Sequence, residues 1–307
     1  RMAVALDRGQ VAALDRTAAF VELELELECG HPRDLFAVAR RLDRAAPVRI
    51  GALSKADRGF RLIAELRDNA KAGAPRLDPA LGPVGACAAI VTDCLHHYRV
   101  NEAILLAQRV PEALHQARVA LRRLRSAHAV FAPLLRDDTS ARLDGEVRRL
   151  ARILGVARDF DVLWERSGPE RRARLAPGRE QAWRQVAAAL GASATRHLFL
   201  DLAEWSLLGT WREAPETAAQ RSQPLTGFAA AALDRRLRRV SRHGHHLAEL
   251  PDEARHTLRK DAKKLRYAVE FFAALHDKGG AARHRKRFLA ALKELQDQLG
   301  ALNDLAV

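Results

Sequence analysis

The spacing of hydrophobic and polar residues changes once along this chain. In residues 20–28 apolar residues alternate with glutamate, so the apolar side chains share one face, which predicts a β-strand with an acidic face. Residues 34–42 have the spacing of an amphipathic helix. Glycine and proline gather in residues 68–84, and this breaker-rich segment predicts a linker between two domains.

From Ala86 onward the chain has helical periodicity, interrupted by Pro, Gly, Asp and Ser turn signals. Its apolar residues are mainly Leu, Ala and Val, a mixture that favours helices. We therefore expect a mainly α fold after a small N-terminal α+β part. The expected helices cover residues 86–109, 112–132, 141–154, 160–166, 179–191, 194–209, 227–248, 252–276 and 281–299.

An internal repeat is the most informative feature of the sequence. Residues 114–125 match residues 255–266 at an offset of 141, with one His, four basic positions and one Leu in register. Residues 154–159 match residues 299–304 at an offset of 145. The two matches predict two related, pseudo-symmetric helical bundles.

On a helix, the basic residues of this repeat are spaced so that their side chains line one stripe of a little over two turns. Leucine and alanine form an adjacent apolar stripe, which is expected to face a bundle core and to leave the basic stripe at its margin. In the first copy the apolar stripe is Leu114, Ala117, Leu121 and Leu124. The basic stripes are His115, Arg118, Arg122 and Arg125, and then His256, Arg259, Lys263 and Arg266.

The charge of the chain points to an anionic partner. It has 52 Lys and Arg against 38 Asp and Glu, a net charge of +14 at pH 7, which fits nucleic acid, an anionic membrane surface or a phosphate polymer. An Arg-rich solvated surface is the alternative. Position favours a partner, because two long segments contain no acid and like charges on one helix repel. The second of these segments contains Arg235, Arg236, Arg238, Arg239, Arg242, His243, His245 and His246.

These residue types suit binding more than catalysis. Arginine meets phosphate oxygens with a planar fork, and Lys and His add single donors, so a row of them suits a linear phosphate chain. No Gly-rich phosphate loop, nucleophile beside a base or carboxylate cluster accompanies the stripes in the sequence. Cys29, Cys87 and Cys94 lack metal-ligand spacing and are expected to be buried. Without a membrane-length apolar run or a signal peptide, a cytoplasmic protein with no membrane partner is expected.

The two basic helices, residues 115–125 and 256–272, strongly resemble the signature helices of the CHAD domain, the conserved histidine α-helical domain. The resemblance extends over about residues 85–307, and family members continue into a further helix, so a C-terminally truncated domain is expected. It implies two bundles around a basic cavity that binds inorganic polyphosphate without a cofactor. The binding residues that it implies are His115, Arg118, Arg122, Arg125, His256, Arg259, Lys263 and Arg266, together with Arg123 and Lys264.

Residues 5–9, 22–26 and 54–60 resemble the end of a CYTH domain, the triphosphate tunnel fold often joined to CHAD in inorganic triphosphatases. Residues 1–67 are then its incomplete C-terminal part. A late Glu-x-Glu strand of such tunnels helps to hold Mg²⁺ or Mn²⁺, which makes Glu22 and Glu24 candidate ligands. The alternative is an edge strand kept soluble by its acidic residues.

The leading hypothesis from the sequence is therefore polyphosphate binding. Its first alternative is an inorganic triphosphatase in the full-length protein, with this chain itself inactive because the opening Glu-x-Glu-x-Lys strand of the tunnel is missing. The second alternative is nucleic-acid binding. It is disfavoured because no recognised DNA- or RNA-binding motif is present and the stripes face inward in the resembling fold. Oligomeric state and preferred polyphosphate length stay open.

Overall fold

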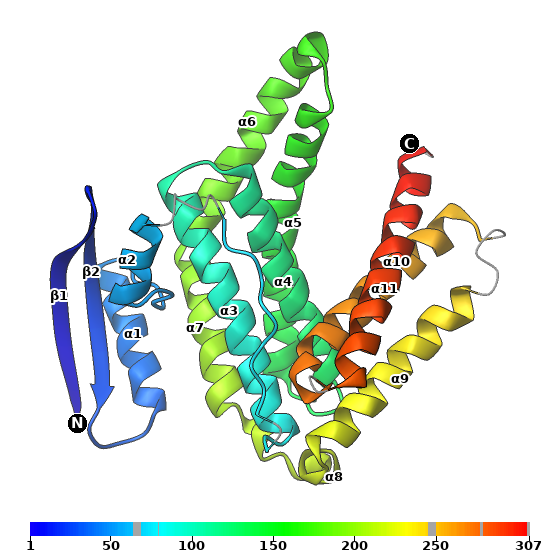
Figure 1. The fold of residues 1–307 in the computed structure, drawn as a ribbon. Helices are drawn as coiled ribbons and strands as arrows, with labels where there is room; N and C mark the ends of the chain where they lie inside the picture. The colour runs from blue at the N-terminus through cyan, green and yellow to red at the C-terminus, as the bar shows by residue number, and fades with distance from the viewer. Residues whose placement is uncertain (64–68, 79, 245–249, 277–278, 306–307) are drawn as a thin grey trace. The chain divides into compact units, whose positions relative to one another are not determined.

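The computed structural model describes residues 1–307 except 64–68, 79, 245–249, 277–278 and 306–307, and only the backbone of 243, 276 and 301–305 (Figure 1). It is mainly helical after a two-stranded N-terminal hairpin, which confirms the expected fold class. The chain divides into two compact units that interleave in sequence. The first unit contains residues 1–72, 92–122 and 137–210, and the second contains residues 73–91, 123–136 and 211–307.

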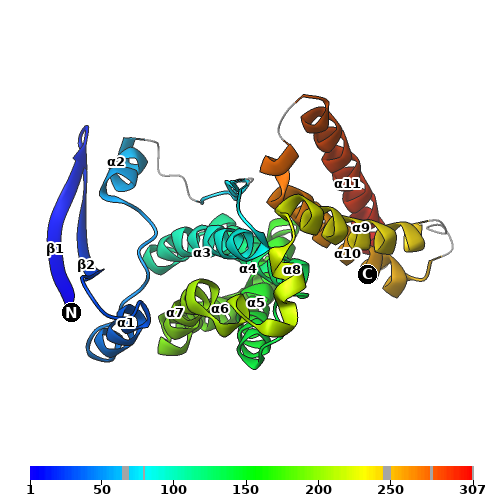
Figure 2. The same ribbon diagram turned by 90° about the horizontal axis from the view of Figure 1, so that it is seen from below.

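The first unit begins with an antiparallel hairpin of β1 (Met2–Ala13) and β2 (Arg16–Leu27), in which Leu6 lies opposite Leu23. The strand β2 was predicted, whereas β1 was not, because its first residues lack a clean alternation. Helices α1 (Arg33–Ala45) and α2 (Lys55–Ile63) lie on the same side of the hairpin (Figures 1 and 2). The acidic face is the one that α2 covers, since Glu22 pairs with Arg58, while Val21 and Leu23 are 66% and 40% exposed.

The first unit continues into a helical bundle. Its helices are α3 (Pro83–Ala107), α4 (Pro111–Phe131), α5 (Asp138–Glu165), α6 (Pro169–Gly191) and α7 (Ser193–Leu208), of which α3 and α4 also contribute to the second unit. Leu114, Ala117 and Leu121 of α4 are completely buried, and Leu124 is nearly so, as the apolar stripe predicted. The ring of Tyr98 stacks on Phe199 with centroids 4.1 Å apart.

One helix break and one helix start predicted from the sequence are wrong. Helix α5 runs without interruption from Asp138 to Glu165, although a break was expected between residues 154 and 160. Helix α6 begins at Pro169, ten residues earlier than expected, and continues through Pro177 and Gly178. A Cβ on Gly178 would lie 2.7 Å from the Phe160 ring. The glycine therefore allows the α5 ring to pack directly on the α6 backbone, and this contact outweighs the local preference for a turn.

The second unit contains a smaller bundle. The helices described from Thr210 onward are η1 (Thr210–Arg212), η2 (Pro215–Thr217), α8 (Ala218–Ser222), α9 (Leu225–Gly244), α10 (Asp252–Phe271), η4 (Ala273–His276) and α11 (Gly280–Leu305). The core of α9, α10 and α11 consists of Val240, Leu258, Ala262, Leu265, Leu292 and Leu299. Phe131, at the end of α4, stacks on Phe228 with ring centroids 5.1 Å apart. Helix α10 ends at Phe271, five residues earlier than expected.

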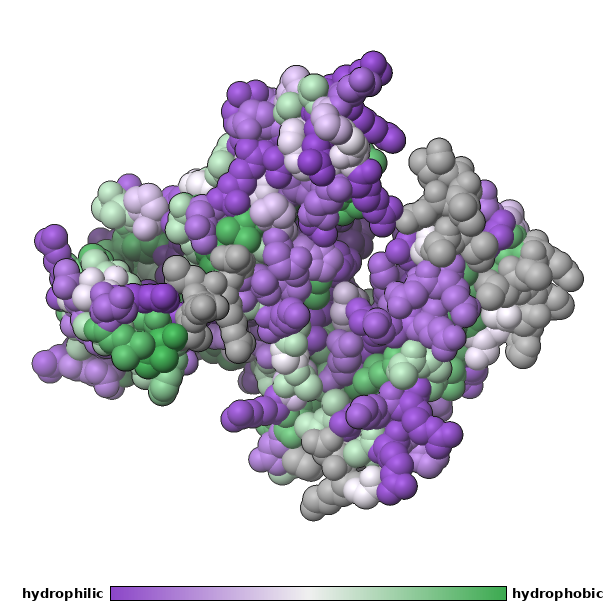
Figure 3. Space-filling view, turned by 45° about the horizontal axis from the view of Figure 1, so that its top comes forward, coloured by the Kyte–Doolittle hydropathy of each residue, from purple (hydrophilic) through white to green (hydrophobic). Residues whose placement is uncertain are grey.

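The surface agrees with most of the smaller expectations. Hydrophilic side chains cover most of the helical surface on the face shown in Figure 3. None of the helices in the described ranges is long and apolar enough to cross a membrane. Cys87 and Cys94 are buried as expected, but Cys29 is exposed because it lies in the turn after the hairpin.

Candidate functional site

The first candidate site is the α4 stripe, which consists of His115, Arg118, Arg122 and Arg125. Helix α5 holds Arg118 in place, because Nη1 of Arg118 donates hydrogen bonds to the carbonyl oxygen of Gly155 at 3.0 Å and to Oδ1 of Asp159 at 3.3 Å. The side chain of Arg118 is 21% exposed, whereas that of Asp159 is 75% exposed. The sequence match at residues 154–159 therefore marks the segment of α5 that supports the stripe.

Positive charge accumulates around His115. Burial lowers the pKa of His115; Glu112 acts in the opposite direction, while Arg122, Arg158 and Arg118 add to the lowering. Burial also lowers the pKa of Arg118, which Asp159 partly offsets. Arg158 of α5 thus belongs to this site, although it was not among the residues predicted to bind. The signal that could have identified it is its place inside the second sequence match.

The remaining members of the α4 stripe differ in exposure. Nε of Arg122 is buried and has no hydrogen-bond partner within the described part of the chain. Arg125 lies on an exposed position of α4, in the part of the helix that belongs to the second unit. Three members of the stripe, with Arg158, therefore form one cationic cluster in the first unit.

The second candidate site is the α10 stripe, which consists of His256, Arg259, Lys263 and Arg266. Arg259 packs against α11, since a Cβ on Gly300 would lie 3.1 Å from Nη2 of Arg259. Gly300 is the repeat counterpart of Gly155, so both copies place an arginine of the basic helix against a glycine of a neighbouring helix. His256 is exposed, but partial desolvation still lowers its pKa, and the charges of Lys260, Arg259 and Lys263 lower it further.

Arg266 completes the α10 stripe in a different way. Its guanidinium lies over the ring of Tyr267, 5.2 Å from the centroid, and its Nε is 3.8 Å from Oε1 of Glu270. Stacking on an aromatic face holds a guanidinium while leaving its outer N–H groups available to a ligand.

Two further predicted residues lie in unlike surroundings. Arg123 is 2% exposed and donates hydrogen bonds to the carbonyl oxygen of Gly73 at 3.0 Å and to Oε2 of Glu270 at 3.3 Å. Its guanidinium also lies over the ring of Phe271. Lys264 is exposed and donates to Oδ1 of Asp261 at 3.1 Å. Arg123 is thus tied into the interior of the second unit, whereas Lys264 reaches its surface.

The predicted metal ligands have cations of the chain itself as partners. Glu22 pairs with Arg58, and Oε1 of Glu24 lies 3.7 Å from Nζ of Lys55, which also pairs with Asp7. Among the described residues, no three His, Cys, Asp or Glu side chains are grouped closely enough to hold a metal ion. In this structure Glu22 and Glu24 therefore face cations of the same chain.

The acid-free segment at residues 235–248 is only partly described. His245 and His246 lie outside the described residues, as does the side chain of His243. Arg235, Arg236 and Arg239 of α9 line a pocket of the second unit. Sequence reasoning noted these arginines as a run of charge but did not assign them to a site.

Comparisons with known proteins agree with this architecture. The family model described as CHAD domain matches residues 89–307. The crystal structure of the CHAD domain from the plant Ricinus communis is similar, with a TM-score of 0.67 and 29% sequence identity, and the match covers 78% of this chain and 80% of that one.

Two uncharacterized proteins of Mycobacterium tuberculosis, one from each of two strains, are 32% identical to this chain over 177 residues. The match covers 52% of this chain and 34% of each mycobacterial protein, so the chain spans about a third of their length.

Proposed function

Because this chain belongs to the CHAD domain family, we propose that it binds inorganic polyphosphate along the α4 and α10 stripes. The observation that carries the proposal is that the same arrangement occurs twice. Each signature helix presents a histidine, an arginine packed against a glycine of the next helix, and further cations one to two turns along. A linear phosphate polymer offers negative charge at regular intervals, which such a row of donors can follow.

The local electrostatics support an anionic ligand. Both stripe histidines have a lowered pKa because burial and neighbouring cations disfavour their charged forms. Nε of Arg122, Arg259 and Arg266 is buried without a hydrogen-bond partner in the described structure. A phosphate group beside these residues would relieve the repulsion and accept the unused hydrogen bonds. Single-stranded nucleic acid offers phosphate too, but its bases bind by stacking on aromatic side chains, and Tyr267 is already covered by Arg266.

The test is binding of labelled long-chain polyphosphate to the purified chain over a series of salt concentrations. Affinity should fall steeply with salt, because each neutralised phosphate releases counterions. Arg122→Gln and Lys263→Gln should each weaken binding about tenfold at low salt and reduce the salt slope by about one. Arg171→Gln is the matched control, since Arg171 is exposed on α6 and has no partner within the described residues.

A flat salt response, or equal losses in Arg171→Gln and Arg122→Gln, would contradict the proposal. Competition decides between the two polymers. Short duplex DNA should displace polyphosphate poorly when both are present at equal phosphate concentration, and efficient displacement would favour the nucleic-acid alternative.

We further propose that residues 1–67 are the C-terminal part of a CYTH domain, which keeps an inorganic triphosphatase as the second candidate function of the full-length protein. The specific observation in its favour is the mixed charge on one face of the hairpin, where Asp7, Glu22 and Glu24 meet Lys55 and Arg58. The given chain should hydrolyse tripolyphosphate poorly with Mg²⁺ or Mn²⁺, because half a tunnel cannot position metal and phosphate together. Release of phosphate at ordinary enzyme rates would contradict this.

A further inference from the structure

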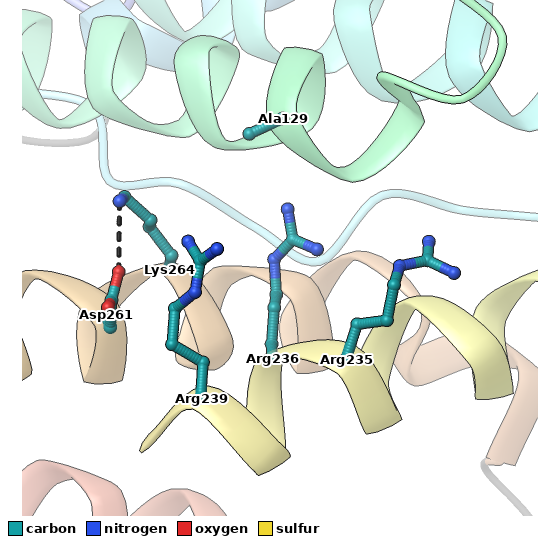
Figure 4. Close-up of a pocket in the computed structure, with 6 residues that line it drawn as sticks. All are labelled: Ala129, Arg235, Arg236, Arg239, Asp261 and Lys264. Carbon is teal, nitrogen blue, oxygen red and sulfur yellow. Dashed lines mark hydrogen bonds and ion pairs between the residues drawn. The ribbon is translucent and has the colours of Figure 1, made fainter. Parts of the chain in front are cut away.

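The second unit contains a cationic pocket that is separate from the residues of the two stripes. It has a volume of about 220 Å³ and lies between α9, α10 and the end of α4. Its lining consists of Arg235, Arg236, Arg239, Lys264, Asp261 and Ala129. We refer to it as the α9 pocket (Figure 4).

The three arginines of the α9 pocket lie on the same side of their helix. Neighbouring residues on a helix point about 100° apart, so Arg235 and Arg236 have different starting directions. Figure 4 shows both side chains, with Arg239, rising from α9 to the same side, toward Ala129 on α4. The side chains therefore place three guanidinium groups in a row along one pocket, where the charges of Arg235 and Arg239 repel that of Arg236.

Carboxylates do not neutralise this cluster. Asp261 is the acidic residue of the lining, it is 8% exposed, and it already accepts a hydrogen bond from Lys264 at 3.1 Å. Within the described residues, Arg235 and Arg239 have no hydrogen bond or ion pair. Arg236 donates to the carbonyl oxygen of Ala232 only at the limiting distance of 3.5 Å, and its Nε is buried without a partner.

The charge of Arg236 is consequently unfavourable in the free protein. Burial is the largest cause that lowers its pKa, to about 10, and Arg235 and Arg239 add to the effect, while Asp261 opposes it. An anion between the arginines would offset the effects of burial and repulsion on the pKa of Arg236. The pocket is thus arranged for a ligand of high negative charge.

Size restricts that ligand. Pockets for drug-sized molecules have volumes of roughly 300–1,000 Å³, and the α9 pocket is smaller than these. This volume fits one or two phosphoryl groups and is small for a nucleotide with its base and sugar.

We propose that the α9 pocket binds a compact phosphate anion of the pyrophosphate type, which Arg235, Arg236 and Arg239 hold from α9 and Lys264 from α10. The anion has two possible sources, free pyrophosphate or the terminal phosphoryl groups of a polyphosphate chain. Both present the same phosphate oxygens to the arginines. Binding of free pyrophosphate does not depend on the proposed function, because the arginines lie outside both stripes, whereas binding of chain ends rests on it.

The experiment is a calorimetric titration of the full chain with pyrophosphate in the absence of metal. Arg235→Gln and Arg239→Gln should each weaken pyrophosphate binding at least tenfold. Arg238→Gln is the matched control, because it removes the same charge from an exposed position of the same helix that does not line the pocket. Circular dichroism of each variant shows whether α9 remains folded.

Asp261→Asn provides a test of opposite sign. It removes the carboxylate of the pocket while keeping its shape, so pyrophosphate should bind two- to fivefold more tightly, by roughly 0.4–1 kcal/mol. A general dependence on net charge would affect Arg238→Gln and Arg239→Gln equally. Such equality, or a wild-type chain that does not bind pyrophosphate, would overturn the inference.

Long-chain polyphosphate separates the two sources and the two proposals. If the pocket takes chain ends, saturating polyphosphate should abolish pyrophosphate binding in the Arg122→Gln variant as well as in the wild type; if it takes free pyrophosphate, binding should persist. Polyphosphate binding without pyrophosphate binding would refute the pocket alone. Pyrophosphate binding without polyphosphate binding would refute the proposed function alone.

Discussion

The two signature helices, α4 and α10, carry the same pattern of residues in different surroundings. Arg123 and Lys264 occupy equivalent repeat positions, yet Arg123 is buried between Gly73, Glu270 and Phe271, whereas Lys264 is exposed beside Asp261. The first residue stabilises the second unit, and the second lines an anion pocket. Equivalence in a repeat therefore fixes a position on a helix but not the role of the side chain there.

The two stripes differ in the same manner. His115 is half-buried among Arg118, Arg122 and Arg158, while His256 is exposed and has Arg259, Lys260 and Lys263 as its charged neighbours. The α4 stripe relies on arginine and the support of α5, and the α10 stripe substitutes lysine at one position. We expect the α4 stripe to be the more rigid of the two and the α10 stripe to adapt more readily to its ligand.

The largest expected effect separates Arg123 from Lys264. Arg123→Met should lower the free energy of unfolding by about 3 kcal/mol, because it leaves the carbonyl of Gly73 without its partner and Glu270 with only the more distant Arg266. Lys264→Met should cost less than about 1 kcal/mol, since its ion pair is exposed on the lysine side. Urea denaturation followed by circular dichroism measures both. Equal losses would mean that the two positions are equivalent after all.

A smaller effect concerns the pH dependence of polyphosphate binding. Phosphate contact raises the pKa of a histidine, and both His115 and His256 start below their ordinary value of 6.5 in the free protein. Affinity should therefore rise as the pH falls through the interval between the bound and free pKa values, and the gain should be complete only below the free value. We expect about a fivefold gain per histidine, roughly 1 kcal/mol.

His115→Gln and His256→Gln should each remove part of this gain and leave the affinity at pH 8 unchanged, as measured by fluorescence anisotropy. The half-buried His115 should contribute more than the exposed His256, because its contact with phosphate is less screened by solvent. If both variants keep the complete pH dependence, the histidines pack or cap their helices and do not contact phosphate.

The smallest expected effect concerns the acidic partner of Arg118. Asp159→Asn should change the free energy of unfolding by less than about 0.5 kcal/mol, because the pair is largely solvated on the Asp159 side. It should also raise polyphosphate affinity up to threefold by releasing Arg118. The repeat counterpart, Asp304, has a side chain outside the described residues. A similar gain in Asp304→Asn would extend the symmetry of the two stripes to their acidic partners.

The sequence by itself determined the helical class, the repeat and the composition of both stripes. These features depend on periodicity, because the spacing of Leu114 and Leu121 dictates which face of α4 is buried, and the basic residues beside them must then lie at its edge. Gly155 and Gly300, which correspond in the second sequence match, were also visible in the sequence, but the sequence did not show what they contact. Its packing against Arg118 or Arg259 explains why it recurs.

Only the tertiary structure decided which basic residues are free to bind. Arg123 is an internal residue because Glu270, 147 positions away in the chain, lies beside it. The arginines of α9 line a pocket because α10 and α4 lie next to them. Likewise, α6 continues through Pro177 and Gly178, and the ring of Phe160 packs in the space that Gly178 leaves by lacking a Cβ. Such contacts join residues far apart in the chain, and local spacing carries no information about them.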